Sequence, residues 1–148
     1  MENEVLIKEE TFEKARKRIR ENKGEKIIFT SNDDELNRKV AEKEEINNLL
    51  LSQSGRKDRL KQRNSGLNQV VAKIAKKKNI SIGINLDEII DSNAKTKAEI
   101  LGRVKQNVKL CNKNKLKMKF ISQKYKKDSY DLKALGLVLG MPTNMLKC

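Results

Sequence analysis

The sequence predicts an α/β fold with parallel strands, and three observations support this prediction. Five short apolar runs alternate along the chain with helical patterns, as in strands joined by right-handed crossover helices. No linker or low-complexity stretch divides the 148 residues, a length typical of one domain. Five strand–helix units are too few for an eight-stranded barrel, which usually needs about 250 residues. We therefore expect one α/β domain over residues 1–148, with an open or partly curled sheet.

The first third of the chain is predicted to contain three strands and two helices. Apolar runs place the strands at 4–8, 26–30 and 48–52. Thr11 is expected to cap a helix that ends at Glu21. Ser31 or Asn32 is expected to cap the next helix, because acidic residues fill the turn that follows.

The rest of the chain is predicted to add two strands, at 79–85 and 117–122. Ser65 is expected to cap a helix over 66–78, and Ser129 is expected to cap the last helix, which ends before Pro142. A short helical turn is expected at 87–91. A long helix should start at Asn93 or Thr96, with these residues on its buried face: Ala94, Ala98, Leu101, Val104, Val108 and Cys111.

Positive charge is concentrated in the second part of the chain. The whole chain has 34 Lys and Arg against 20 Asp and Glu. Residues 1–50 contain 11 basic and 13 acidic residues, whereas residues 51–148 contain 23 basic and 7 acidic residues. The segment 105–127 has nine lysines and no carboxylate. Such a localised excess predicts a polyanionic partner such as RNA; a lysine-rich surface with no partner is the alternative.

The residues for many kinds of catalysis are missing. The chain has no histidine, no Walker loop and no Gly-x-Gly-x-x-Gly motif, and neither cysteine has a base nearby in the sequence. Asp58 and Asp131 remain as candidate catalytic carboxylates, although an ion pair and a helix start explain them more simply. We expect no catalytic residue and no metal site in the chain. The sequence shows no signal peptide and no membrane span, so we expect a cytoplasmic protein with no membrane partner.

The most informative segment is a basic loop, 53–64, between the third strand and the next helix. Loops at the carboxyl ends of parallel strands commonly carry function, and the helix start that follows favours anions. Gly66 would let a phosphate approach the backbone. The predicted phosphate-binding cations of the loop are Arg56, Lys57, Arg59, Lys61 and Arg63.

An ordered set of motifs resembles the 30-kDa protein subunit of ribonuclease P, component 3 of the archaeal enzyme. The set covers residues 55–141. In the first third of the chain, only the layout of strands and helices matches the family. Its motifs are Gly-Arg-Lys-Asp at 55–58, Gly-Leu-Asn-Gln-Val-Val-Ala-Lys at 66–73, Gly-Ile-Asn-Leu at 83–86, Lys-Leu-Cys at 109–111, Phe-Ile-Ser at 120–122 and Asp-Leu-x-x-Leu-Gly-x-x-Leu-Gly-Met at 131–141.

The resemblance implies an incomplete TIM-barrel-like fold and a role in tRNA processing. Members of this family are subunits of the ribonucleoprotein endoribonuclease, a hydrolase that removes 5′ leaders from precursor tRNA. The RNA subunit performs the cleavage with bound Mg²⁺, so the chain itself is expected to hold no cofactor. The implied partners are ribonuclease P RNA, precursor tRNA, protein component 2 and further protein subunits.

The resemblance also assigns residues within the matching motifs. Arg56 and Lys57 are expected to contact phosphate, with Asp58 orienting one of them. Lys73 and Lys76 are further candidates, although an ordinary solvated helix face explains them equally well. The residues expected to support the loop are Gly66, Asn68 and Gln69.

The chain departs from the family pattern in three places. The first two strand–helix units are missing, residues 59–64 are an insertion, and the chain ends soon after Met141. The edge strands left by a shortened barrel would need to be covered by the chain itself, a partner or a second copy.

Two other functions remain open from sequence. One is a general basic nucleic-acid-binding or chromatin-associated protein that reuses the fold. The other is a stand-alone magnesium-dependent nuclease that uses acidic residues.

Overall fold

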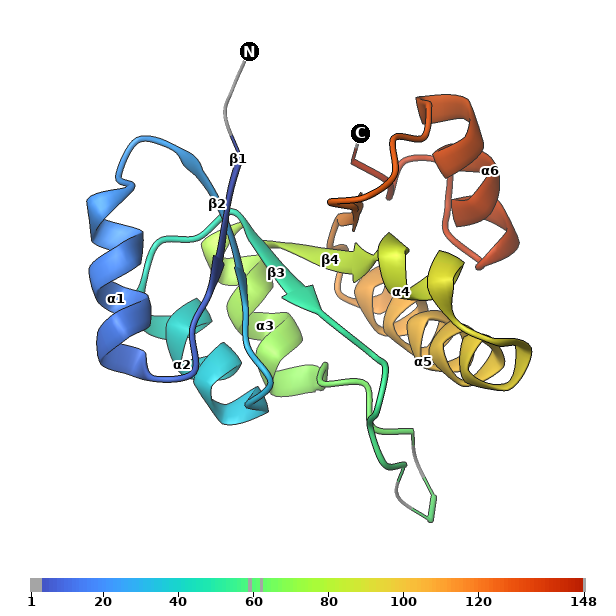
Figure 1. The fold of residues 1–148 in the computed structure, drawn as a ribbon, viewed down its shortest axis with the longest axis horizontal. Helices are drawn as coiled ribbons and strands as arrows, with labels where there is room; N and C mark the ends of the chain where they lie inside the picture. Colours follow the sequence, from blue (N-terminus) through green and yellow to red (C-terminus); the bar gives the residue numbers. More distant parts are fainter. Residues whose placement is uncertain (1–3, 59, 62, 148) are drawn as a thin grey trace.

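The computed structural model describes residues 4–58, 60–61 and 63–147, in which five parallel strands form one sheet (Figure 1). Each strand pairs with the next in the sequence, so the order is β1-β2-β3-β4-β5. This order arises when each crossover adds its strand at the same edge of the sheet. The strands are β1 (Glu4–Lys8), β2 (Lys26–Thr30), β3 (Asn48–Leu51), β4 (Ser81–Asn85) and β5 (Met118–Ile121).

Helices form the crossovers between the strands. None of the helices in the described residues is long and apolar enough to cross a membrane, since α5, with 20 residues, carries many lysines. The helices are α1 (Phe12–Glu21), α2 (Asp34–Lys43), α3 (Gln69–Lys78), α4 (Leu86–Asp91), α5 (Ala94–Lys113) and α6 (Ser129–Val138).

The helix starts confirm some predicted caps and correct others. Thr11 caps α1 and Asn93 caps α5, as predicted. Asp33, rather than Ser31 or Asn32, caps α2, because its carboxylate accepts the backbone N–H groups of Glu35 and Leu36.

The two remaining serine caps were also wrong. Asn68, rather than Ser65, caps α3, so residues 66–68 belong to the loop. Ser65 is buried, and its hydroxyl lies 3.5 Å from the carbonyl oxygen of Leu67. Asp128, rather than Ser129, caps α6, because its side chain accepts the N–H of Asp131.

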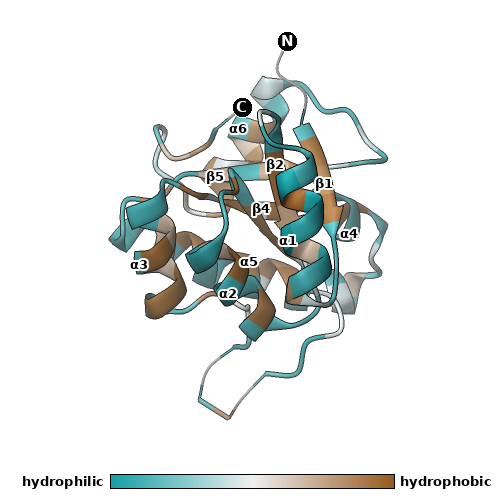
Figure 2. Cartoon of the chain, turned by 90° about the vertical axis from the view of Figure 1, so that its left-hand side faces the viewer, coloured by the Kyte–Doolittle hydropathy of each residue, from teal (hydrophilic) through white to brown (hydrophobic). Residues whose placement is uncertain are grey.

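The main core lies between the helices and one face of the sheet. Ile7, Phe29, Leu49, Ile82 and Met118 each come from a different strand, and all are 0 % exposed. Figure 2 shows hydrophobic strands inside and hydrophilic outer surfaces on the helices.

The buried face of α5 includes Val104, Val108 and Cys111, as predicted, but differs from the prediction near the start of the helix. Ala94 and Ala98 are exposed, whereas Ile100, Arg103 and Asn107 are buried. The buried stripe therefore begins later than predicted, at Ile100, and includes two polar side chains.

The opposite face of the sheet holds a small second cluster. Leu6, Ile28, Leu50 and Ile121 contribute side chains from β1, β2, β3 and β5. Between them, a Cβ on Gly83 of β4 would lie 2.6 Å from Cδ1 of Ile121 and 3.2 Å from Cα of Leu50, so a larger residue would crowd this face. The sheet is curled, since an ion pair between Lys119 and Glu4 brings its edge strands β5 and β1 together.

The first and last strands approach one another without pairing. Lys119 of β5 forms an ion pair with Glu4 of β1, but β1 and β5 are the two edges of the strand order. The parallel α/β prediction is confirmed, whereas an open sheet does not establish a TIM-barrel-like fold. The chain covers part of the β5 edge itself, since Met118 N–H donates to Met145 O at 3.2 Å and Lys147 N–H donates to Met118 O at 2.8 Å.

Candidate nucleic-acid interface

The basic loop extends from the carboxyl end of β3 and leads into α3 (Figure 1). Its tip projects away from the body of the molecule. Side-chain hydrogen bonds tie both of its ends to the helices. Residues 59 and 62 are outside the described residues, so the expectation for Arg59 has no structural counterpart here. The side chains that hold the two ends determine how the exposed cations of the loop are presented.

Arg103 of α5 binds the first part of the loop at three points. Its Nε donates to Asp58 Oδ1 at 3.0 Å, its Nη1 to the carbonyl oxygen of Gln53 at 2.8 Å, and its Nη2 to that of Arg56 at 2.7 Å. The Arg103 side chain is only 3 % exposed. A planar guanidinium with five N–H donors suits this task, which a lysine could not perform.

Arg56 forms a second internal contact rather than extending into solvent. Its Nη1 and Nη2 donate to the two carboxylate oxygens of Asp34 on α2, at 2.9 and 3.0 Å, and its Nε donates to Ser52 O at 2.7 Å. Only 13 % of the side chain is exposed. This bidentate pair fixes the loop against α2.

Gly66 leaves the space in which the Arg56–Asp34 pair lies. A Cβ at Gly66 would be 2.6 Å from Arg56 Nη2 and 3.0 Å from Asp34 Oδ1, and the residue has a φ of +78°. Glycine is therefore required both by the backbone and by the space. The close neighbour is this ion pair, whereas the sequence suggested a phosphate.

Glu88 of α4 holds the start of the loop. Its carboxylate accepts the backbone N–H of Gln53 at 2.6 and 2.9 Å and that of Ser54 at 2.8 Å. Burial raises the pKa of Glu88, although these two N–H donors oppose the shift.

Asp58 has the opposite electrostatic environment. The hydrogen bond from Arg103 lowers its pKa, and the backbone N–H of Asn64 adds to this effect. We expected Asp58 to orient Arg56 or Lys57, but its ion-pair partners in the described residues are Arg103 at 3.0 Å and Arg63 at 4.0 Å. Asp58 thus joins the two sides of the loop.

Lys57, Lys61 and Arg63 are the exposed cations of the described loop. Arg63 is 50 % exposed and lies across α5, where a Cβ on Gly102 would be 2.7 Å from its guanidinium. Lys57 and Lys61 have no carboxylate partner within the described residues, so their charges are available to a ligand.

The α3 residues fall into two groups. Asn68 caps the helix, and Gln69 exchanges two hydrogen bonds with Asn114 at the end of α5, at 2.9 and 3.2 Å. Both side chains therefore stabilise α3, Asn68 at its first turn and Gln69 through its contact with the end of α5. Lys73 and Lys76 are exposed, and Lys76 Nζ lies 3.3 Å from the carbonyl oxygen of Lys115.

The two candidate catalytic carboxylates have structural partners. Asp58 is bound by Arg103, and Asp131 lies in the first turn of α6, where its N–H bonds to the cap residue Asp128. No group of three or more metal-ligating side chains occurs in the part of the chain that the structure describes. Cys111 is buried, which raises the pKa of its thiol to about 12.

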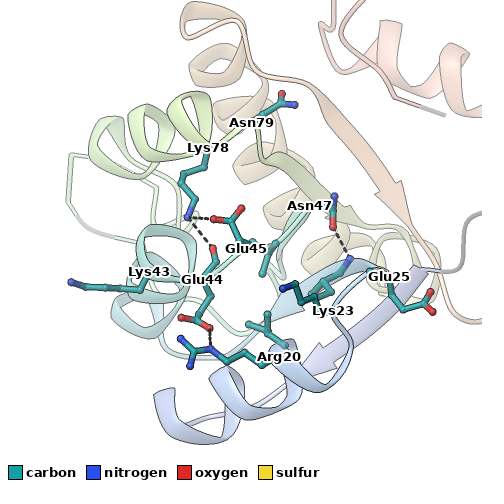
Figure 3. Close-up of a pocket in the computed structure, with 13 residues that line it drawn as sticks. Arg20, Lys23, Glu25, Lys43, Glu44, Glu45, Asn47, Lys78 and Asn79 are labelled. Carbon is teal, nitrogen blue, oxygen red and sulfur yellow. Dashed lines mark hydrogen bonds and ion pairs between the residues drawn. The ribbon is translucent and has the colours of Figure 1, made fainter.

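A separate hollow of about 620 Å³ lies at the other end of the strands (Figure 3). Two of its cations are already paired: Lys78 with Glu45 at 3.3 Å, and Arg20 with Glu44 at 3.3 Å. Lys23, Lys43 and Glu25 also line the pocket, so its wall carries charges of both signs.

The sequence prediction missed Arg103, Glu88 and Asp34 as residues that organise the loop. The available signal was one arginine inside the apolar stripe of α5, three residues after Ile100. An arginine at such a position needs buried acceptors, and a loop rich in backbone carbonyls supplies them.

Comparison with known structures identifies a similar fold. A chain in a cryo-EM structure of archaeal ribonuclease P with mature tRNA has a TM-score of 0.74 and 24% sequence identity to this chain. The match covers 94% of this chain and 60% of that chain, so this chain spans about three fifths of the length of its neighbour. No family model matches, and no curated protein matches. At this identity the likeness shows a shared fold.

Proposed function

We propose that this chain is a protein subunit of a ribonuclease P ribonucleoprotein, of the component 3 family. The main support for the proposal is the fold match, over 94% of this chain, to a chain in the structure of archaeal ribonuclease P with mature tRNA. The ordered motifs over residues 55–141 point to the same family independently of the fold.

In this proposal the chain binds RNA and does not cut it. The RNA subunit removes the 5′ leader of precursor tRNA and holds the Mg²⁺, and protein component 2 is the expected protein partner. The α/β domain acts as a rigid support, and the contacts that fix the ends of the basic loop supply that rigidity.

The basic loop supplies the RNA contacts in a specific way. Arg103, Arg56 and Glu88 hold the ends of the loop, so that binding RNA costs little ordering entropy there. Lys57 and Lys61 are exposed and unpaired in the described residues, and we assign them to phosphate contacts. Arg56 is then a positioning residue, because its three donor groups already have partners.

The test is cleavage of precursor tRNA by the cognate ribonuclease P RNA at limiting Mg²⁺, with and without this chain and component 2. Addition of the chain should raise removal of the 5′ leader, and the chain alone should show no cleavage. Lys57→Gln with Lys61→Gln should reduce the gain and lower the salt slope of RNA binding by about two. Unchanged cleavage on addition of the chain would contradict the proposal.

A general nucleic-acid-binding protein is the second candidate, and the net charge of +14 favours it. Such a protein would bind any RNA or DNA duplex with the same affinity and the same steep salt dependence. A preference for ribonuclease P RNA over a duplex of equal length separates the two functions.

A further inference from the structure

A second basic surface lies outside the loop, on the helices. It consists of lysines 73 and 76 of α3, lysines 109 and 113 of α5, and Lys115, which follows α5. All five are exposed, and none is paired with a carboxylate in the described residues. We call these five residues the lysine seam.

Two contacts show that the two helices of the seam lie side by side. The amides of Gln69 and Asn114 exchange hydrogen bonds across the helices, at 2.9 and 3.2 Å. Lys76 Nζ lies 3.3 Å from Lys115 O. The seam therefore lies on two helices that are packed against each other.

The spacing on α5 gives the surface a direction. Lys109 and Lys113 are four residues apart, which places them about 6 Å apart along the helix axis. Both lie opposite the buried positions Val104, Val108 and Cys111. The side chains therefore form a row on the solvent side.

The seam has no acidic residue to offset its charge. Helix α3 has no acidic residue in its first turn and ends with three lysines, and segment 105–127 contains no carboxylate. The lysines of these two segments that pair with an acid in the described residues lie outside the seam: Lys78 pairs with Glu45, Lys119 with Glu4 and Lys124 with Asp91. A repulsive cluster of this kind costs stability in the free protein, and a polyanion removes that cost.

We propose that the lysine seam binds the phosphate backbone of a double-stranded RNA segment, as a second RNA-binding surface distinct from the basic loop. The seam offers ammonium groups on flexible stems, with no aromatic side chain among its members for stacking on bases. It therefore suits recognition by shape and phosphate rather than by sequence, as expected for duplex RNA. The inference rests on the proposed RNA-binding role of the chain.

The test measures the affinity of the full chain for a 20-base-pair RNA duplex at about 50 and 200 mM salt. Over this range, the loss of two phosphate contacts changes the salt effect on affinity by about tenfold. The seam variant is Lys73→Gln with Lys109→Gln, one change on each helix. The matched control is Lys14→Gln with Lys17→Gln, two exposed lysines of α1, which lies far from α5 in Figure 1. Both variants remove two charges, and urea unfolding checks that both remain folded.

The wild-type chain should lose about tenfold more affinity than the seam variant between these salt concentrations. The α1 control should behave like the wild type. Equal losses in the seam variant and the control would show a diffuse charge effect and overturn the seam.

Two further outcomes separate the seam from the proposed function. An unchanged seam variant, together with a weakened loop variant carrying Lys57→Gln and Lys61→Gln, overturns the seam and leaves the subunit function standing. If the wild type does not bind the duplex but still stimulates cleavage of precursor tRNA, the seam is again overturned and the subunit function again stands.

Discussion

The arginines and the lysines near the basic loop carry the same charge but occupy different environments. Arg103 and Arg56 are 3 % and 13 % exposed, and each donates hydrogen bonds from all three of its guanidinium nitrogens to protein acceptors. Lys57 and Lys61 are exposed, and within the described residues they have no acidic partner. Net charge alone therefore overstates how many cations are available to an anionic ligand.

The difference follows from side-chain chemistry. A guanidinium is a flat fork of donors that can bind a carboxylate and backbone carbonyls together, whereas an ammonium is a compact, strongly hydrated charge. The arginines thus fix the position of the loop, and the lysines remain available to a ligand.

The largest expected effect on stability comes from Arg103→Met. The variant leaves Asp58 and the carbonyl oxygens of Gln53 and Arg56 without their donor. We expect a loss of about 3 kcal/mol in the free energy of unfolding, measured by urea denaturation.

Arg18→Met is the matched control for this variant. Arg18 pairs with Glu9 at 2.8 Å, but its side chain is 42 % exposed, so the loss should remain below about 1 kcal/mol. Equal losses in the two variants would mean that the buried arginine has no special role.

Gly66→Ala should have the next largest effect. The backbone there has a φ of +78°, and the new Cβ would lie 2.6 Å from Arg56 Nη2. The left-handed backbone costs about 1 kcal/mol with alanine, and displacement of the Arg56–Asp34 pair adds to this cost. Urea denaturation gives the total.

Gly24→Ala separates the two contributions. Gly24 has a φ of +96°, and a Cβ added there would have no neighbour within 4 Å, so only the backbone cost applies. Gly66→Ala should exceed Gly24→Ala, and the excess should vanish in an Arg56→Ala background. A persistent excess would show that Arg56 is not the cause.

The sequence alone was sufficient to predict the strands and most of the helices, because the apolar periodicity that marks them is a local property of the sequence. The strands at 4–8 and 26–30 were predicted with the observed bounds, and Cys111 lies in the core as expected. Cap predictions failed where several suitable residues are adjacent, as at 31–33, because the choice depends on the other hydrogen bonds that each side chain makes, such as that from Ser31 to Asn37.

The loop ties could not be predicted because they join distant residues. Arg103 and Asp58 are 45 positions apart, and Arg56 and Asp34 are 22 apart. A composition count treats Arg56 and Lys57 alike, and only the folded arrangement shows that one of them is already bound. The predicted RNA contacts themselves stay predictions.

The smallest expected effect is a pH dependence of opposite sign for the two carboxyl groups that tie the loop. The pKa of Asp58 lies below its ordinary value of 3.8, mainly because Arg103 donates to it. Its contribution to stability is therefore present above that value and is lost as the pH falls through the lower folded pKa. Burial raises the pKa of Glu88 above 4.5, so its contribution is present below 4.5 and is lost as the pH rises through the folded pKa.

Urea unfolding across both pH ranges tests this pair. Asp58→Asn should flatten the decline in stability on the acid side of 3.8, and Glu88→Gln should flatten the decline above 4.5. Each variant is the control for the other, because they act on opposite sides of the profile. If both variants altered the same side, the hydrogen bonds from Gln53 and Ser54 would outweigh the burial of Glu88, and the start of the loop would be held by a fully charged carboxylate.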